Sequence, residues 1–271
     1  MNKKLKATFM SAILASGLSA CTGTSYTPGE PVKIDDEIGW TDTNRVLSHI
    51  DRAERTGRNS ANSNIPNVIE ITIDSPGGRV QDGYRIINRL QESQAQVHLK
   101  CEGKAASMAA IILITATGRD RDAKDSCTIM IHQSYYEVRD PNNPRRNLTR
   151  TLYEALLPQY QIAKENPHVE KFVINQTGDP PYELSRHKLI NWVEQLAYDR
   201  RNFVDRLAAT TRLNTNDIEY LLSNGDNYFT VEEAAFAGMI DTIEGRTPSA
   251  SQINQGREDF CAQLPRLSVC G

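Results

Sequence analysis

The chain has 271 residues, of which 39% are hydrophobic and 24% charged, and its formal net charge is −3. This length fits one α/β domain of about 200 residues with appendages. Basic and acidic residues are well mixed along the chain, so composition gives no electrostatic basis for nucleic-acid binding. No nucleic-acid partner is therefore expected.

The first 20 residues have the pattern of a lipoprotein signal peptide. Three lysines within the first six residues precede a short apolar run, residues 7–18, which is too short to span a bilayer stably. The run ends in Leu-Ser-Ala-Cys at residues 18–21, which looks like a bacterial lipobox cleaved before Cys21. The thiol of Cys21 would then carry the lipid, with palmitate among its acyl chains. An ordinary cleaved signal with an incidental cysteine is the alternative.

Cleavage at this point predicts a lipid-anchored protein of the bacterial cell envelope. Residues 21–31 are polar and contain Pro and Gly, so they are expected to form a tether between the membrane and the fold. Thr22 stands where an Asp would favour retention, which resembles the outer-membrane sorting pattern. The predicted location is the periplasmic face of the outer membrane, with the membrane itself as a partner.

Strand-like and helix-like segments alternate up to residue 132, and the helical ones have apolar residues at helical spacing. Strands are expected at 32–39, 68–73, 97–101 and 128–131, and helices at 41–55, after 78 and at 107–117. This β-α-β-α-β order predicts an α/β fold with a parallel sheet and right-handed crossovers.

The character of the sequence changes after residue 132. A polar, Pro-rich loop at 139–147 is followed by a helical pattern over 148–176 that Pro158 and Pro167 should break. Further helices are expected at 185–209, 214–222 and 230–237, and a strand at 239–243. Residues 245–271 are polar and are expected to be loosely attached.

Three short motifs directly follow predicted strands. They are Ser-Pro-Gly-Gly at 75–78, Gly-Lys-Ala-Ala-Ser-Met at 103–108 and Met-Ile-His-Gln at 130–133. Each is weak alone, since the first suits any tight turn, Ser107 could be a helix N-cap and His132 could be structural. Ligands bind at the carboxyl ends of parallel strands, so the three motifs are expected to converge on one crevice. A serine at a helix N-terminus beside a histidine suits nucleophilic catalysis.

Together the motifs resemble those of the Clp-type (caseinolytic) serine protease proteolytic subunits. The resemblance covers about residues 32–243, less a central stretch. It implies a ClpP/crotonase-like fold with a parallel β-sheet, repeated β-α-β units and a helical handle region. The handle carries an insertion at about 139–185, and residues 244–271 form a C-terminal tail.

The resemblance also assigns roles to single residues. Ser107 would be the nucleophile, His132 the general base and Asp226 the triad acid, because residues 226–241 match the motif of the family that begins with the acid. The N–H groups of Gly78 and Met108 would form the oxyanion hole. The other candidate acids, Asp205 and Asp217, look like exposed helix positions. The implied activity is endopeptidase cleavage of peptides or unfolded proteins, with no cofactor and no metal.

Two departures from the family limit what the resemblance implies about assembly. A homo-oligomer is expected, but the insertion at 139–185 and the tether at Cys21 favour a single ring or a smaller particle over two stacked rings. An exported protein has no access to ATP, so no ATPase partner is expected.

Export would also permit disulfides among four cysteines: Cys101, Cys127, Cys261 and Cys270. Three connectivities are open. Cys261 and Cys270 could close a short C-terminal loop, while Cys101 and Cys127 could either pair or pack as small hydrophobic residues.

Three other functions remain as alternatives. The first is a catalytically inactive, Clp-like lipoprotein scaffold that binds a partner. The second is a crotonase-type acyl-CoA enzyme, which shares the fold class but does not need the pair of Ser107 and His132. The third is a Ser–Lys signal-peptide peptidase, which the matched positions of His132 and Asp226 disfavour.

Overall fold

The structure is a computed structural model that describes residues 30–59, 68–116, 120–138, 149–151, 153–175 and 181–271. The signal peptide, Cys21 and nearly all of the tether lie outside the described residues, as does the loop at 139–147. Within the described ranges, none of the helices combines the length and the apolar composition that crossing a bilayer requires.

A seven-stranded, mostly parallel sheet forms the centre of the fold. Its strands are β1 (Val32–Ile34), β2 (Val68–Ser75), β3 (Gln96–Ala106), β4 (Arg121–Ala123), β5 (Thr128–Ile131), β10 (Asn227–Phe229) and β11 (Thr242–Ile243). The order is β1-β2-β3-β4-β11, and β5 pairs with β3 and with β10. Only β10 runs antiparallel to its neighbour. The predicted α/β fold with a parallel sheet is confirmed.

The long strand β3 explains how the sheet divides near the site. Its first half pairs with β4 through residues 99–101, and its last three residues pair with β5 through residues 104–106. Ser107 follows immediately at the end of β3, and His132 follows at the end of β5. The two motifs therefore lie at the carboxyl ends of paired parallel strands.

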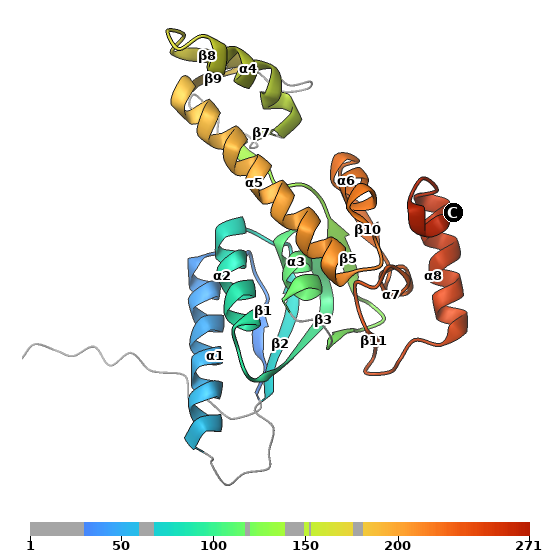
Figure 1. Ribbon diagram of the computed structural model, residues 1–271. Helices are drawn as coiled ribbons and strands as arrows, with labels where there is room; N and C mark the ends of the chain where they lie inside the picture. The colour runs from blue at the N-terminus through green and yellow to red at the C-terminus, as the bar shows by residue number, and fades with distance from the viewer. Residues whose placement is uncertain (1–29, 60–67, 117–119, 139–148, 152, 176–180) are drawn as a thin grey trace, which may run out of the picture.

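Helices α1 (Trp40–Asn59), α2 (Val80–Gln91) and α3 (Met108–Thr115) pack beside the sheet (Figure 1). The apolar faces of α1 and α2 are buried, as the spacing of Val46, Ile50, Ile86 and Leu90 predicts. Helix α3 is apolar all round, and every residue of it is buried, because it contacts β3 on one side and α2 and α5 on others.

A separate unit projects from the main body at one end of the longest helix. It comprises β6 (Tyr136–Val138), β7 (Thr149–Thr151), α4 (Tyr153–Glu165), β8 (Lys171–Ile174), β9 (Tyr182–Ser185) and the first half of α5 (Arg186–Thr210). Figure 1 shows α5 running from this projecting unit down to α3. The unit has its own hydrophobic cluster, built from Leu156, Ala163, Phe172, Ile174, Leu184, Leu189, Val193 and Leu196.

The projecting unit corrects one prediction and confirms another. The helix expected at 185–209 is α5. The break expected at Pro158 is wrong, because α4 continues through this proline. Burial of Leu156 and Ala163 in the cluster offsets the backbone hydrogen bond that the proline removes. Beyond α4, residues 171–174 of the expected helical stretch form β8 instead, which pairs antiparallel with β9.

The C-terminal part is better packed than its polar sequence indicates. Helices α6 (Thr215–Ser223) and α7 (Val231–Ala237) begin at the capping boxes of Asn214 and Thr230. The expectation of a loosely attached tail at 245–271 is wrong, because α8 (Ala250–Gln263) packs against α7 and precedes a short 3₁₀ helix, η1 (Ser268–Cys270). Phe260 is fully buried and stacks on Phe229 with ring centroids 5.5 Å apart, and Leu264 and Leu267, which follow the helix, are also buried.

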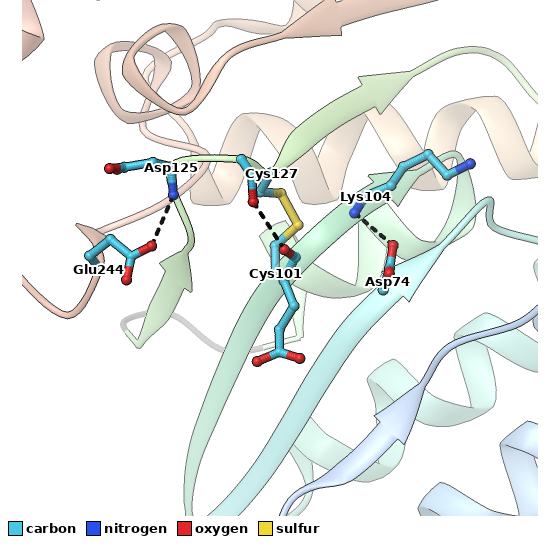
Figure 2. Close-up of a disulfide and its surroundings, with 8 residues drawn as sticks. Asp74, Cys101, Lys104, Asp125, Cys127 and Glu244 are labelled. Carbon is cyan, nitrogen blue, oxygen red and sulfur yellow. Dashed lines mark hydrogen bonds between the residues drawn. A yellow bond between two sulfur atoms is a disulfide. The ribbon is translucent and has the colours of Figure 1, made fainter.

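Both cysteine pairs form disulfides in the structure. Cys101 and Cys127 have Cα atoms 6.0 Å apart, and Cys261 and Cys270 have Cα atoms 5.5 Å apart. Figure 2 shows the first bridge joining β3 to the segment that precedes β5. This bridge thus links the two strands that carry the serine and histidine motifs.

Candidate active site

Ser107 occupies an unusual backbone conformation between β3 and α3. Its φ and ψ angles are 54° and −125°, and only one other non-glycine residue of the described chain, Glu244, has a positive φ. Such a conformation costs on the order of 1–3 kcal/mol and tends to occur at functional positions. Ser107 stands at the N-cap position of α3, but its Oγ makes no capping hydrogen bond. This strand–turn–helix geometry resembles the sharp turns that expose nucleophilic serines.

The Pro-Gly-Gly turn after β2 packs directly against Ser107. Gly77 has a φ of 98°, and a Cβ added there would lie 2.6 Å from both the Ser107 Cβ and the Ala106 carbonyl oxygen. The turn is held by buried Ser75, whose Oγ donates to the Asp36 carbonyl oxygen at 2.6 Å and accepts from the Gly77 N–H at 3.1 Å. Glycine at 77 is therefore required both by the backbone angle and by the space available.

This packing makes a testable prediction about Gly77. Gly77→Ala is expected to lower the free energy of unfolding by about 3 kcal/mol, because the new Cβ collides with backbone and the positive φ is strained. Gly245→Ala is the matched control, since Gly245 also has a positive φ, 71°, but open space around it. Its expected loss is about 1 kcal/mol. Urea unfolding of the two variants measures the difference, and equal losses would contradict the close packing of Gly77 on Ser107.

The backbone N–H groups of Gly78 and Met108 belong to the two turns beside Ser107. Met108 is the first residue of α3, so its N–H has no intrahelical acceptor. Within the described chain, no acceptor is recorded for the N–H of Met108 or for that of Gly78. The two turns are close together, because a Cβ on Gly77 would lie 2.9 Å from the Met108 nitrogen. The donors are therefore available for an incoming negative charge.

His132 follows β5 and is buried. Its Nδ1 lies 2.6 Å from the carbonyl oxygen of Gln133. A carbonyl oxygen only accepts hydrogen bonds, so Nδ1 carries the proton of a neutral ring, and Nε2 is then the basic nitrogen. The ring also stacks on Tyr135 with centroids 5.3 Å apart. Both contacts fix the orientation of the imidazole.

A cavity of about 760 Å³ brings the three motifs together. Its floor includes Gly77, Gly78, Ser107 and His132 at the ends of the strands. Three residues from the middle of α5, Gln195, Leu196 and Asp199, also line it. The full lining is Glu37, Pro76, Gly77, Gly78, Arg79, Val80, Gln81, Ser107, His132, Ser134, Tyr135, Tyr136, Gln195, Leu196 and Asp199. The convergence expected from the sheet topology is thus observed.

Asp226 lies near this site but does not line the cavity. It is exposed, in the turn that precedes β10. In the antiparallel pairing of β10 with β5, Asn227 stands opposite Ile131, so one further step along the ladder brings Asp226 opposite His132. The turn is anchored by buried Asn227, whose Nδ2 donates to the carbonyl oxygens of Leu221 and Gly225 at 2.7 and 3.0 Å.

The other candidate acids take different places. Asp205 is exposed on α5, as expected. The expectation that Asp217 is exposed is wrong, because it is buried and belongs to the capping box of α6. It also accepts hydrogen bonds from the N–H and the Oγ of Ser268, both at 2.6 Å. Asp217 therefore holds the C-terminal segment onto α6.

Sequence reasoning missed two charged residues of α5. Asp199 lines the cavity, and burial raises its pKa to about 6 although a hydrogen bond from Gln195 acts in the opposite direction. Arg200, the next residue, donates to the Glu219 and Glu154 carboxylates at 2.6 and 2.8 Å. It also reaches the Gln133 Oε1 at 3.3 Å and so supports the segment after His132. The only sequence signal for the pair of Gln195 and Asp199 is their spacing of one helical turn.

No group of three or more His, Cys, Asp or Glu side chains in the described part of the chain is placed to hold a metal ion.

Comparison with known proteins matches residues 34–188 to the Clp protease family. The chain belongs to this family. It is 27% identical over 117 residues to the ATP-dependent Clp protease proteolytic subunit 1 of Shouchella clausii, covering 43% of this chain and 55% of that protein. It is 31% identical over 152 residues to the proteolytic subunit of Dioscorea elephantipes, covering 54% and 67%. A shorter match, 43% identical over 65 residues, links it to subunit 2 of a Synechococcus strain, covering 24% and 33%.

The chain thus spans about half the length of the Shouchella clausii relative and a third of the Synechococcus relative. Family membership agrees with the parallel sheet and confirms the predicted ClpP-like fold.

Proposed function

We propose that this chain is a serine endopeptidase that cleaves peptides or unfolded proteins with Ser107, His132 and Asp226. One observation supports this proposal above the others. Ser107 has a positive φ at a helix N-terminus, makes no capping bond and shares a cavity with His132. A serine used only as a cap would need neither the strained backbone nor the neighbouring histidine.

The proposed first half-reaction forms an acyl-enzyme. Nε2 of His132 takes the Ser107 hydroxyl proton as Oγ attacks the carbonyl carbon of the scissile peptide bond. The tetrahedral intermediate places its oxyanion against the N–H groups of Gly78 and Met108, where the N-terminal end of α3 adds favourable electrostatic potential. His132 then protonates the leaving amine as the C–N bond breaks.

In the second half-reaction, water hydrolyses the acyl-enzyme with the help of the same groups. His132 takes a proton from water, the hydroxide attacks the ester carbon, and the Ser107 oxygen leaves with the proton returned by His132. Asp226 would stabilise the imidazolium that forms in each half-reaction and keep the ring in the useful tautomer. The register of β10 on β5 supports this role, because it brings Asp226 opposite His132.

Hydrolysis of internally quenched peptides and of unfolded casein by the purified full-length chain tests this proposal. The expected result is time-dependent cleavage by the wild-type chain and none by Ser107→Ala. Ser126→Ala, an exposed serine outside the cavity, is the matched control and should cleave like the wild type. Absence of cleavage across a broad peptide library would favour the alternative of an inactive binding scaffold.

We further propose that the protein is exported and anchored to the outer membrane through Cys21, facing the periplasm. The lipobox-like residues 18–21 and the polar tether support this location. Wild-type protein is expected in the membrane fraction with a diacylglyceryl and acyl mass on residue 21, whereas Cys21→Ser should lack both. Mass spectrometry of the mature N-terminus measures this. An unmodified N-terminus that begins elsewhere would refute the anchor.

The Cys21→Ser form also tests the proposed assembly, a homo-oligomer that works without an ATPase partner. Exposed apolar side chains of the projecting unit, Ile162, Val169 and Val173, support contact with another copy. The native mass of the soluble form is expected to correspond to a single ring or to a smaller oligomer. A monomer, or two stacked rings, would contradict this proposal.

A further inference from the structure

Asp199 is a buried carboxylate that lines the same cavity as Ser107 and His132. It projects from the middle of α5, and only 5% of its surface is exposed. Its recorded side-chain contact is with Gln195, one helical turn earlier, whose Nε2 donates to Oδ1 at 2.8 Å. One amide hydrogen bond satisfies only part of the accepting capacity of an ionised carboxylate.

The cations near Asp199 are paired with other groups. Arg200 binds Glu154 and Glu219, and Arg206 donates to Gln91 and Asn88. Arg79, which also lines the cavity, pairs with Asp82 at 3.3 Å. Within the described part of the chain, Asp199 itself forms no ion pair. Its negative charge is therefore directed at the cavity without a compensating positive charge from the protein.

Burial of an unpaired carboxylate has an energetic consequence for Asp199. Burial disfavours the ionised form and raises the pKa to about 6, so the carboxylate is ionised at neutral pH at a cost to folding. Buried charges are normally paired, and an exception inside a cleft marks a functional position. A cation supplied by the substrate would satisfy this carboxylate.

We infer that Asp199 is a specificity residue that binds the ammonium or guanidinium group of a lysine or arginine next to the scissile bond. This inference rests on the proposed peptidase function and names its substrate class. Tyr136 and Leu196 also line this part of the cavity and offer apolar surface to the aliphatic stem of such a side chain. Exposed Glu37 adds a second negative charge to the lining.

Paired substrates measure this preference directly. Internally quenched peptides blocked at both ends would carry either Lys or norleucine at one position flanking the scissile bond, with each flanking position varied in turn. At pH 8 the wild-type chain is expected to cleave the best Lys peptide about 10- to 100-fold faster in kcat/KM than its norleucine partner, as a charge-assisted hydrogen bond would give. Asp199→Asn is expected to reduce this ratio to near 1.

Two controls separate recognition from damage to the fold. Asp199→Asn keeps the shape and can still accept from Gln195, and since it removes a buried charge its Tm at pH 8 should equal or exceed that of the wild type. Asp205→Asn, an exposed acid on the same helix, should keep the wild-type ratio. Equal cleavage of Lys and norleucine peptides by the wild type, or an unchanged ratio in Asp199→Asn, would overturn the inference.

The pH dependence of the ratio gives an independent readout. The preference for Lys should grow as pH rises through about 6, because ionised Asp199 binds the cation and protonated Asp199 does not. The titration of His132 affects the cleavage of both peptides, so it cancels in the ratio of their kcat/KM values. Burial raises the pKa of Tyr84 and of Tyr136, so both phenols stay neutral in this range. Glu37, Arg79 and Tyr135 also line the cavity, and Tyr198 and Arg206 lie near Tyr84.

Peptide binding to the Ser107→Ala variant tests the role of Asp199 separately from the proposed peptidase function. The Kd of the same Lys peptide is expected to be about 10-fold or more below that of the norleucine peptide, and the double variant Ser107→Ala/Asp199→Asn should lose this difference. If the wild-type chain cleaves nothing, the peptidase function fails while this measurement still decides the role of Asp199. Equal Kd values for both peptides would refute it.

Discussion

Ser107→Ala is expected to lower kcat/KM for a cleaved peptide by at least about 10³-fold, and His132→Ala by a similar factor. The structure gives the reason for the similarity, because the two side chains line one cavity at the ends of paired strands and would share one proton transfer. Groups that act as a unit are strongly non-additive. The double variant is therefore expected to be no more impaired than either single variant.

Fluorogenic peptide assays on the three variants measure this, with far-UV circular dichroism as the check on folding. Ser126→Ala provides the matched serine control. Wild-type turnover by Ser107→Ala would remove the serine from the mechanism. Multiplicative losses in the double variant would show that Ser107 and His132 act independently.

Asp226→Asn is expected to lower kcat by up to about 10⁴-fold with little change in KM. In the proposed triad, an asparagine at this position can present an N–H where the carboxylate would accept one, which favours the wrong tautomer of His132. The fold should survive, because Asp226 is exposed and the turn is anchored by Asn227 instead. Steady-state kinetics and urea unfolding of the same preparation test the two halves of this prediction.

Two other acids give matched controls for Asp226. Asp205→Asn should leave turnover and stability unchanged, since its carboxyl is exposed on α5. Asp217→Asn should mainly reduce stability, because Asp217 accepts from Asn214 and Ser268. Full activity of Asp226→Asn would assign the orientation of the His132 ring to another acceptor, such as the Gln133 carbonyl oxygen that Nδ1 of His132 contacts.

The sequence predicts the parallel sheet and the three motifs well because these depend on short-range physics. Alternating β-rich and helical segments determine the order of elements, and Gly77 and Ser107 need backbone angles that the local motif itself specifies. The carboxyl ends of parallel strands lie at one edge of the sheet, so the convergence of the motifs can be predicted without knowledge of side-chain packing. The same reasoning places the helices that begin at Asn214 and Thr230, since their capping boxes are local too.

Long-range packing explains what sequence reasoning missed. Pro158 predicts a break, but burial of Leu156 and Ala163 in the projecting unit keeps α4 continuous. The polar composition of residues 245–271 hides the few buried apolar residues, Phe260, Leu264 and Leu267, that attach this segment to the core. Asp199 belongs to no sequence motif, because its environment arises only when α5 packs beside the residues that line the cavity. The positions of such residues depend on contacts between segments far apart in the chain.

Reaction of the purified chain with a fluorophosphonate, followed by peptide mass spectrometry, tests the catalytic assignment most directly. An activated serine attacks the phosphorus and displaces fluoride, which leaves a covalent adduct of defined mass on its oxygen. The adduct is predicted on Ser107 alone, with labelling lost in His132→Ala and retained in Ser126→Ala. An unlabelled Ser107 in folded wild-type protein, or an adduct on another serine, would contradict the proposed triad.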